Sequence, residues 1–147
     1  MFEGVNTNGG NNTALLDSVT LNSVSVSNGS FESPTVDAGS FQIDPTDTAW
    51  KYIGTAGISA NGSSLTSSNG PAPDGSQVGF VQNNGDVWQT LTLSSGTYSL
   101  SFQAAQSGSA NDTYQQLLVS VRGAPVSVQG KRRWGRVSTL YITLGSR

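Results

Sequence analysis

Two carboxylates occupy positions that favour a shared role in binding a cation. Asp17 lies in residues 12–21 (NTALLDSVTL), a stretch typical of the last strand of a domain. Glu32 lies in residues 28–34 (NGSFESP), a stretch typical of an opening motif. In a sandwich whose first and last strands are neighbours, both carboxylates can reach one cation, and carboxylate oxygens suit a hard ion such as calcium. The pair therefore predicts that these two segments lie side by side.

Asp17 needs a partner wherever it is buried. Residues 15–26 alternate in polarity, which predicts a strand with one buried face, and Leu15, Asp17, Val19 and Leu21 fall on the apolar side. An unpaired buried charge costs several kcal/mol. From the sequence alone, calcium, a cluster of backbone N–H groups and Lys51 are equally acceptable partners.

A second set of residues has the chemistry of sugar recognition, which uses an aromatic ring against the apolar face of a pyranose and planar amides for its hydroxyls. Alternation in residues 86–94 predicts that the Trp88 side chain is exposed, and Gln103 is expected on the outward face of its own strand. Gln and Thr are also ordinary residues of a polar strand surface, and a single exposed Trp can serve an interface instead. The candidate ligand-binding residues are Trp88, Tyr114, Gln82, Gln103, Gln106 and Gln115.

The composition argues against most catalytic chemistry. The chain has no Cys and no His, which removes thiolates and the commonest general base. A glycosidase needs two carboxylates about 5–9.5 Å apart. The pairs Asp74/Asp86 and Asp44/Asp47 are available, but the second is typical of a turn. There is no G-x-S-x-G motif for a serine hydrolase. We therefore expect a protein without catalytic residues.

Charge and hydropathy restrict the partners and the location. Residues 1–130 carry a net charge of −7 and residues 131–147 a net charge of +5. An acidic body does not suit a phosphate backbone, so we expect no nucleic-acid partner. No apolar run approaches the roughly 20 residues of a membrane span. The first residues lack the basic start and apolar stretch of a signal peptide. We expect an extracellular or cell-surface protein whose export signal lies outside this sequence.

The strand pattern predicts one all-β domain. Short alternating segments separated by turn residues are typical of a two-sheet antiparallel β-sandwich. Asn83-Asn84-Gly85 is a hairpin signal. We expect residues 1–13, 36–48 (with Phe41 and Ile43 tucked inward) and 54–75 to be loops, and residues 132–144 to serve as one more strand. The predicted strands are residues 15–26, 49–53, 77–82, 86–94, 98–106 and 113–122.

A series of short motifs resembles a known group of domains. NGSFESP, AWKY, GISANG, PAPDGSQVGFVQ, QTLTLSSGTYSLSFQAAQ and LLVSVRG follow one another over residues 28–123. In order and spacing they resemble the galactose-binding-like jelly rolls of secreted bacterial proteins, which include carbohydrate-binding modules and surface-protein repeats. The resemblance implies a jelly-roll β-sandwich over residues 27–130.

In that group the domain ends with a strand of the type seen here as NNTALLDSV, near the start of the chain. Residues 1–26 thus resemble the closing strand of a preceding or permuted repeat, and residues 131–147 form an atypical basic tail. Our hypothesis is that residues 12–21 fill the closing-strand position, either within their own chain or by strand swapping in a homodimer.

The resemblance also implies a ligand and a metal. Relatives hold a structural calcium, and by position its ligands here are Glu32, Asp17 and main-chain carbonyls near Asn28 and Ser30. The implied function is a non-catalytic carbohydrate-binding module for a plant or microbial polysaccharide or oligosaccharide. The alternatives are a structural repeat of a bacterial adhesin or extracellular matrix protein, and a glycosidase or esterase that uses carboxylates.

Overall fold

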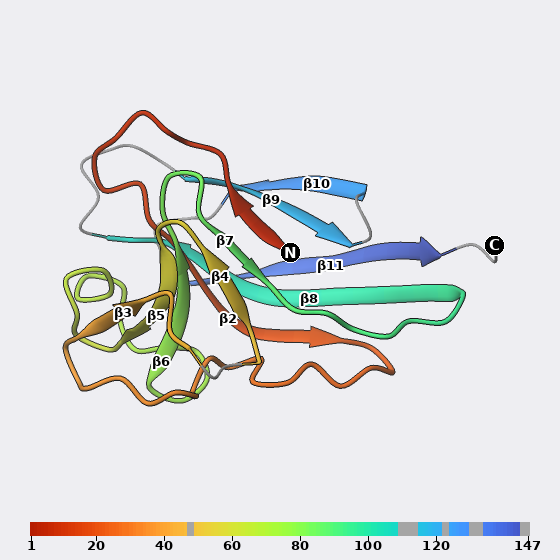
Figure 1. Ribbon diagram of the computed structural model, residues 1–147, viewed down its shortest axis with the longest axis horizontal. Coiled ribbons are helices and arrows are strands. Elements are labelled where there is room, and N and C mark those ends of the chain that lie inside the picture. The colour runs from red at the N-terminus through yellow and green to blue at the C-terminus, as the bar shows by residue number, and fades with distance from the viewer. Residues whose placement is uncertain (47–48, 109–114, 122–123, 130–133, 145–147) are drawn as a thin grey trace.

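The protein is a sandwich of two antiparallel sheets (Figure 1). The computed structural model describes residues 1–46, 49–108, 115–121, 124–129 and 134–144. Within these residues the secondary structure is strand and turn, with no helix able to cross a membrane. The predicted all-β, two-sheet antiparallel β-sandwich is confirmed.

Over the described residues, the two sheets have five and six strands. The five-stranded sheet has the order β10 (Ala124–Gln129), β9 (Gln116–Val121), β1 (Phe2–Gly4), β7 (Asp86–Trp88) and β4 (Lys51–Ile53). The six-stranded sheet has the order β11 (Gly135–Leu144), β8 (Gly96–Gln106), β2 (Ala14–Leu21), β6 (Gln77–Val81), β5 (Ala56–Ala60) and β3 (Phe41–Ile43).

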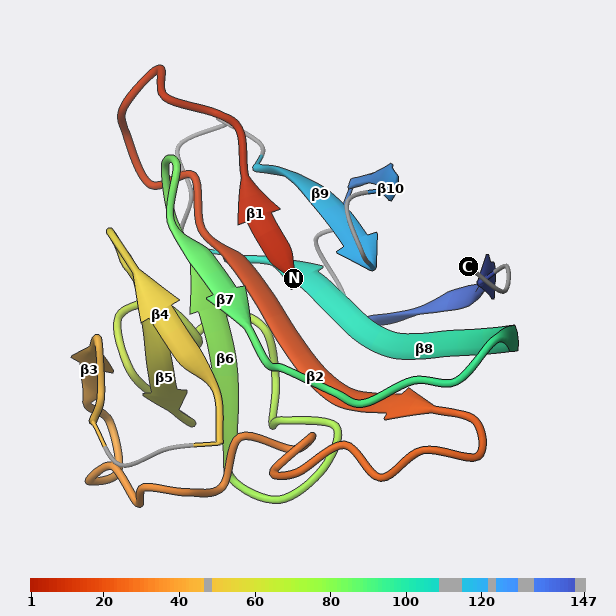
Figure 2. The same ribbon diagram turned by 45° about the vertical axis from the view of Figure 1, so that its right-hand side comes forward.

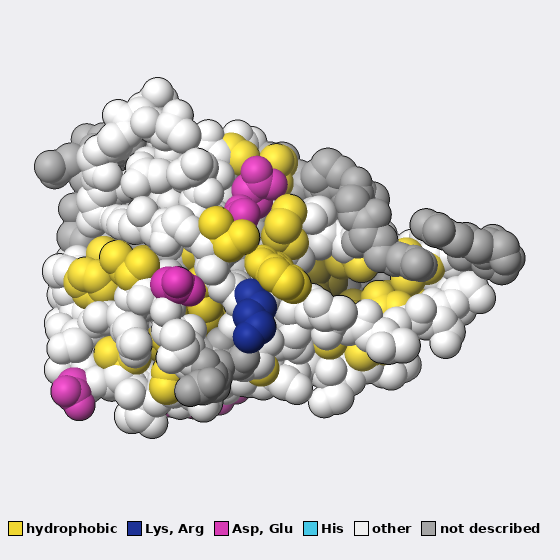
Figure 3. All heavy atoms as spheres, in the orientation of Figure 1, with side chains coloured by type: hydrophobic (Ala, Val, Ile, Leu, Met, Phe, Trp, Pro, Cys, Tyr) yellow, Lys and Arg dark blue, Asp and Glu magenta, His cyan; other side chains and the backbone are white. Residues whose placement is uncertain are grey.

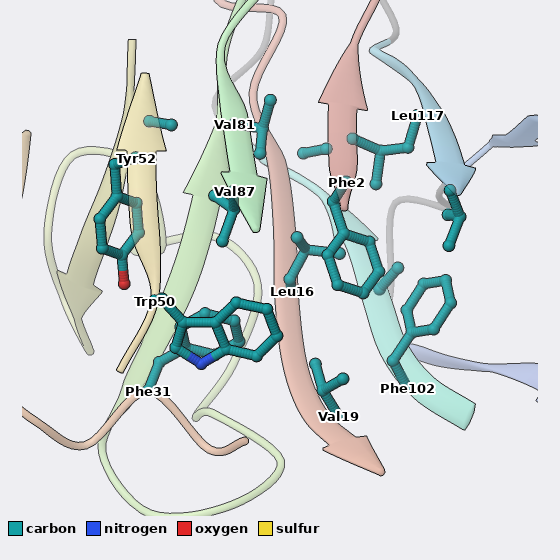
Figure 4. Close-up of a cluster of buried hydrophobic side chains, with 14 of the residues drawn as sticks. Phe2, Leu16, Val19, Phe31, Trp50, Tyr52, Val81, Val87, Phe102 and Leu117 are labelled. Atoms are coloured by element: carbon teal, nitrogen blue, oxygen red, sulfur yellow. The ribbon is translucent and has the colours of Figure 1, made fainter. Parts of the chain in front are cut away.

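The main core fills the space between the sheets and is rich in aromatic rings (Figure 4). Trp50 stacks on Phe31 with ring centroids 5.1 Å apart, and Phe2 meets Phe102 edge-on at 5.0 Å. Such pairs add roughly 0.5–1.5 kcal/mol beyond the burial of their area. Phe31 belongs to the opening motif and is completely buried. The opening motif is therefore anchored in the core by its ring.

A second core covers the outer face of the six-stranded sheet. Its buried side chains come from β2, β6 and β8 and from the loop between β5 and β6 that lies over them. β5 and β6 are buried along their whole length. These two strands are therefore buried on both faces, which explains their apolar runs. The second core consists of Leu15, Leu65, Ala72, Val78, Phe80 and Ala105, with Trp134 packed against it.

β2 lies between β6 and β8 and contains a bulge (Figure 2). The register shifts between Asp17 and Thr20, and Ser18 has a positive φ of 53°. A bulge inserts one residue and reverses the side-chain alternation beyond it. Leu15 accordingly packs in the second core, whereas Val19 packs in the main core. The prediction that these alternate residues share one face is wrong.

Three loop predictions are also wrong. Residues 1–13 contain β1, which lies inside the five-stranded sheet. Residues 54–75 contain β5, a buried strand of small residues that lacks the alternation of a half-buried strand. Phe41 and Ile43 form the edge strand β3, where they are 43% and 48% exposed instead of tucked inward.

The turn at residues 82–85 changes sheets. Gly85 donates a backbone hydrogen bond to Gln82 and Asn83 has a positive φ, as expected of a tight turn. β6 and β7 on either side of it belong to different sheets. The predicted hairpin is therefore wrong in pairing, although the turn itself forms.

Candidate functional site

β2 lies directly against the opening motif. The Val19 N–H donates to the Gly29 carbonyl at 2.9 Å. A Cβ at Gly29 would lie 2.3 Å from the Val19 carbonyl oxygen, so only glycine permits this approach. The two segments that carry Asp17 and Glu32 are thus neighbours within one chain.

Asp17 is a fully buried carboxylate held by backbone N–H groups. Its Oδ1 accepts from the Ser18 N–H at 2.6 Å and its Oδ2 from the Asp74 N–H at 2.8 Å. The pKa of Asp17 is raised to about 7, chiefly by burial; the two backbone hydrogen bonds oppose this rise, and the charges of Asp74 and Glu32 add to it. Of the partners that the sequence left open, the structure shows backbone N–H groups. Lys51 is exposed on the other sheet.

The Glu32 carboxylate is held by the segment that follows Asp74. Its Oε1 accepts from the N–H groups of Ser76 and Gln77 at 3.0 and 2.8 Å, and its Oε2 accepts from the Ser76 hydroxyl at 3.1 Å. Gly75 has a φ of +80°, and a Cβ there would lie 2.5 Å from the Glu32 carboxylate. The loop after Asp74 therefore passes between the two acids and donates to both.

Gln77 is an organising residue that the sequence did not reveal. Its buried side-chain amide donates to the carbonyls of Phe31 and Pro34 at 2.8 and 3.0 Å and accepts from the Val36 N–H at 2.5 Å. This holds the opening motif against β6. The only sequence signal was a polar residue at the start of an apolar strand, which is common at strand ends.

The four predicted calcium ligands are only partly brought together. Asp17 and Glu32 act on each other electrostatically, and Ser30 is half-buried in the adjoining motif. The Asn28 carbonyl accepts from the Trp50 indole N–H at 2.8 Å and from the Phe31 N–H at 3.0 Å, so it is directed into the protein. Among the residues that the structure describes, no group of three or more acids is close enough to hold a metal. A cation here would thus rely on two carboxylates, with carbonyls and water completing its shell.

Trp88 faces outward from the five-stranded sheet. Its neighbour Val87 is completely buried in the main core, and successive strand residues point to opposite faces. The Trp88 side chain is half-buried and lies directly opposite the exposed Lys51 across the strand pair. The indole is thus accessible beside a cationic side chain.

Gln103 lies on the opposite side of the molecule from Trp88. It pairs with Asp17 across β2 and β8, so both side chains are on the outer face of the six-stranded sheet. One sugar cannot contact the outer faces of two different sheets. The prediction of a single aromatic and amide face that includes both residues is wrong.

Three other predicted glutamines form a hydrogen-bonded network at one end of the sandwich. Gln115 is completely buried; its Oε1 accepts from the Val5 and Asn6 N–H groups at 3.1 and 2.8 Å. Gln106 is 1% exposed and accepts from the Gln115 N–H at 2.9 Å. Gln82 donates to the Thr13 hydroxyl. Gln106 and Gln115 therefore connect strands and are removed from the ligand-binding set, and Tyr114 lies outside the described residues.

A groove between the sheets was not foreseen from the sequence. It has a volume of about 390 Å³ and contains no charged side chain among its lining residues. Figure 3 shows hydrophobic side chains exposed between the two layers on this side of the molecule. Most of its apolar lining comes from Phe2, Val19, Leu21, Val26, Trp50, Trp88, Leu91, Leu93, Leu100 and Val121.

The fold and the site define a two-sheet β-sandwich domain whose opening motif is held by the Glu32 carboxylate, the Gln77 amide and a backbone hydrogen bond from Val19. Residues 22–129 match the HpiC1-like family, described as HpiC1 cyclase. Because this match covers more than half of the chain, the chain belongs to the HpiC1-like family. No curated protein and no solved structure matches it.

Proposed function

We propose that this chain is a non-catalytic carbohydrate-binding module whose binding surface is the outer face of the five-stranded sheet around Trp88. The observation that carries the proposal is the accessible indole of Trp88 next to the exposed side chain of Lys51. An aromatic face of this kind accepts the apolar side of a pyranose ring.

The polar partners of the sugar differ from those expected from the sequence. Lys51 provides an ammonium donor on one side of Trp88, and Thr90 provides an exposed hydroxyl two residues further along the chain. These two residues take the role that the buried glutamines cannot. An open sheet face suits a polysaccharide chain better than a small enclosed sugar.

We also propose a structural Ca²⁺ at Asp17 and Glu32. The support is electrostatic: a buried carboxylate with a raised pKa lies near two further acids, and within the described part of the chain no cationic side chain is among the groups that shift it. A bound Ca²⁺ would supply the missing positive charge. Calcium should therefore raise the melting temperature and a chelator should lower it; no shift in either direction would contradict the site.

Affinity electrophoresis in gels that contain β-glucan, xylan or galactan tests the carbohydrate proposal. We expect one polysaccharide to retard the protein and Trp88→Ala to abolish the retardation. Tyr141→Ala is the matched control, because Tyr141 is an aromatic residue that is 78% exposed on the other sheet. Retardation by none of these polysaccharides would contradict the proposal and would favour a structural repeat of a surface protein.

The family match favours a second candidate, a ring-closing enzyme. A cyclase needs an enclosed, mostly apolar site, and the groove falls within the roughly 300–1,000 Å³ typical of small-molecule pockets. Chromatography of apolar unsaturated probes after incubation with the protein would detect a cyclised product. Leu100→Lys, which places a charge in the groove, should abolish such turnover. The matched variant is Lys51→Ala, because Lys51 belongs to the proposed carbohydrate surface but not to the groove lining, which includes Trp88.

A further inference from the structure

Asn-Gly pairs are the positions of this chain that can change chemically with water alone. Because glycine has no side chain, its backbone nitrogen is open to the side-chain carbonyl of the preceding asparagine, and the two can close a five-membered ring. The sequence has five such pairs, all within the described residues, and their asparagines are Asn8, Asn28, Asn61, Asn69 and Asn84. All five are followed by the same residue, so their surroundings must separate them.

In the opening motif, Asn28 is fixed against ring closure. Its side-chain amide donates to the Ser33 carbonyl at 2.6 Å, and its Oδ1 accepts from the Ser33 N–H at 3.1 Å. A Cβ at Gly29 would lie 2.3 Å from the Val19 carbonyl oxygen, so the backbone around the attacking nitrogen is closely packed. Ring closure at Asn28 would have to break this arrangement first.

The loop between β5 and β6 fixes two more of these asparagines. The Asn61 Oδ1 accepts from the Ala72 N–H at 2.8 Å. The Asn69 side chain donates to the Gln106 carbonyl and accepts from the Gly108 N–H, both at 2.7 Å. Each side-chain amide is therefore held by backbone groups from elsewhere in the chain, and it cannot turn to the next backbone nitrogen without losing those bonds.

At Asn84 the attacking nitrogen, rather than the side chain, is held. The Asn84 side chain is exposed in the turn at residues 82–85, but Gly85 is buried and its N–H donates to the Gln82 carbonyl at 2.9 Å. A Cβ at Gly85 would lie 2.6 Å from the Thr55 carbonyl oxygen. The Gly85 nitrogen therefore cannot approach the Asn84 amide unless the turn opens.

Asn8 differs from the other four asparagines because neither reacting group is held. It is exposed in the loop between β1 and β2, which projects beyond the sheets at one end of the sandwich (Figure 1). The Asn8 N–H donates to the Asn6 Oδ1 at 2.9 Å. Among the described contacts, neither the Asn8 side chain nor the Gly9 N–H makes a hydrogen bond. A Cβ at Gly9 would meet no heavy atom within 4 Å, so the two groups have room to approach each other.

We propose that Asn8 is a self-modification site, at which the folded chain converts this one asparagine to aspartate or isoaspartate. The Gly9 backbone nitrogen attacks the side-chain carbonyl carbon of Asn8 and forms a new C–N bond. The bond from that carbon to the side-chain nitrogen breaks, and this nitrogen leaves as ammonia with the proton from Gly9. Water then opens the ring at either carbonyl. The net reaction turns an amide and water into a carboxylic acid and ammonia, so water is the only co-reactant.

The reaction adds a negative charge to a part of the chain that is already acidic, because a carboxyl group is ionised at neutral pH and residues 1–130 carry a net charge of −7. The fold should survive, since the loop is fixed on both sides of Asn8. The Asn6 N–H donates to the Gln115 Oε1 at 2.8 Å, and the Asn12 amide donates to the Asn6 carbonyl at 2.7 Å. The result is a gain of charge with time at one end of the sandwich, and it is independent of carbohydrate binding.

Incubation of the full chain near neutral pH in water labelled with the heavy oxygen isotope, followed by peptide mapping with mass spectrometry, tests the proposal. Ring opening places one solvent oxygen in the product, so the label marks deamidation that occurred during the incubation. Labelled product at residue 8 should form at least about tenfold faster than at the other four pairs, and concentrated urea should remove the difference, because it releases all five asparagines. Equal rates in the folded protein, or no labelled product at residue 8, would overturn the proposal.

Two variants of exposed asparagines locate the reaction. Asn8→Gln should prevent the more acidic form that appears with time in ion-exchange chromatography, because the longer side chain has to close a six-membered ring, which forms more slowly. Asn84→Gln is the matched control and should leave that form unchanged, because Asn84 is also exposed and also precedes a glycine. An acidic form that persists in Asn8→Gln, or that disappears in Asn84→Gln, would assign the reaction to another residue and overturn the proposal.

Discussion

A single buried carboxylate governs part of the stability of this domain. The pKa of Asp17 is raised to about 7 by burial and by the charges of Asp74 and Glu32, whereas in the unfolded chain it is about 3.9. Between these values the folded state holds a proton that the unfolded state has released. Stability from Asp17 is therefore fully present below about pH 4 and is lost as the pH rises to about 7, by at most on the order of 4 kcal/mol.

Urea unfolding as a function of pH checks this prediction. Burial also raises the pKa of Asp86, which contributes a slope of the same sign. The difference between the unmodified protein and Asp17→Asn isolates Asp17, because Asn has no charge to lose. Identical slopes in the two proteins would show that Asp17 does not titrate in this range.

Bound calcium should reverse the pH dependence of folding stability that Asp17 causes. A bound cation favours the ionised form of Asp17, so added calcium should raise the melting temperature more above pH 7 than below pH 5. Asp17→Asn should lose most of that gain. An equal gain in both proteins would place the ion elsewhere.

Substitution of two tryptophans should affect different properties: Trp50 folding stability, and Trp88 carbohydrate binding. Trp50 is 3% exposed, stacks on Phe31 and donates to the Asn28 carbonyl, so Trp50→Ala should cost about 3–5 kcal/mol of folding free energy. Trp88 lies outside the main core, so Trp88→Ala should cost less than about 1 kcal/mol while removing carbohydrate binding. Chemical denaturation gives both values. A large loss of stability in Trp88→Ala would mean that its indole is structural.

At the scale of elements, periodicity predicted the strands that have one buried face. β4 and β8 form close to the predicted bounds, and each alternates between buried and more exposed side chains over part of its length. Periodicity failed where both faces are buried, as in β5, because small residues on both sides leave no alternation. It also failed at Ser18, because nothing in the local sequence shows that a bulge reverses the faces of β2.

The candidate site was predictable only where local sequence decides it. The nearness of Asp17 to Glu32 came from motif order, and the structure agrees with the expected contact between their segments. The prediction that Trp88 and Gln103 share one binding face required their strands to belong to the same sheet, which local sequence does not reveal. Strand alternation correctly gave an outward face for both, but only the topology shows that these are opposite faces.

The loop between the two acids should tolerate no side chain at Gly75. Gly75 and Gly70 both have positive φ, of 80° and 76°, so Ala at either position should cost about 1 kcal/mol from backbone strain alone. At Gly70 a Cβ meets nothing within 4 Å, whereas at Gly75 it would collide with the hydrogen-bonded Glu32 carboxylate. Gly75→Ala should therefore cost clearly more than Gly70→Ala in urea unfolding, and equal costs would show that Glu32 is not held there.

At the scale of the whole molecule, the first residues of the chain hold both sheets together. β1 lies between β9 and β7, and β2 lies between β8 and β6. Each is an interior strand, although both precede the opening motif in the sequence. This arrangement agrees with our hypothesis that residues 12–21 occupy the closing-strand position, here within their own chain.

Removing these strands and returning them as a separate peptide tests that arrangement. Residues 22–147 alone would lack an interior strand in each sheet and would leave core positions opposite Phe31 and Phe102 open to water, so we expect them not to fold. Addition of a peptide of residues 1–21 should restore a cooperative melting transition. The same peptide with Leu16→Lys should not restore it, because Leu16 is completely buried in the main core. A folded protein from residues 22–147 without peptide would show that β1 and β2 are dispensable and that the sandwich closes in another way.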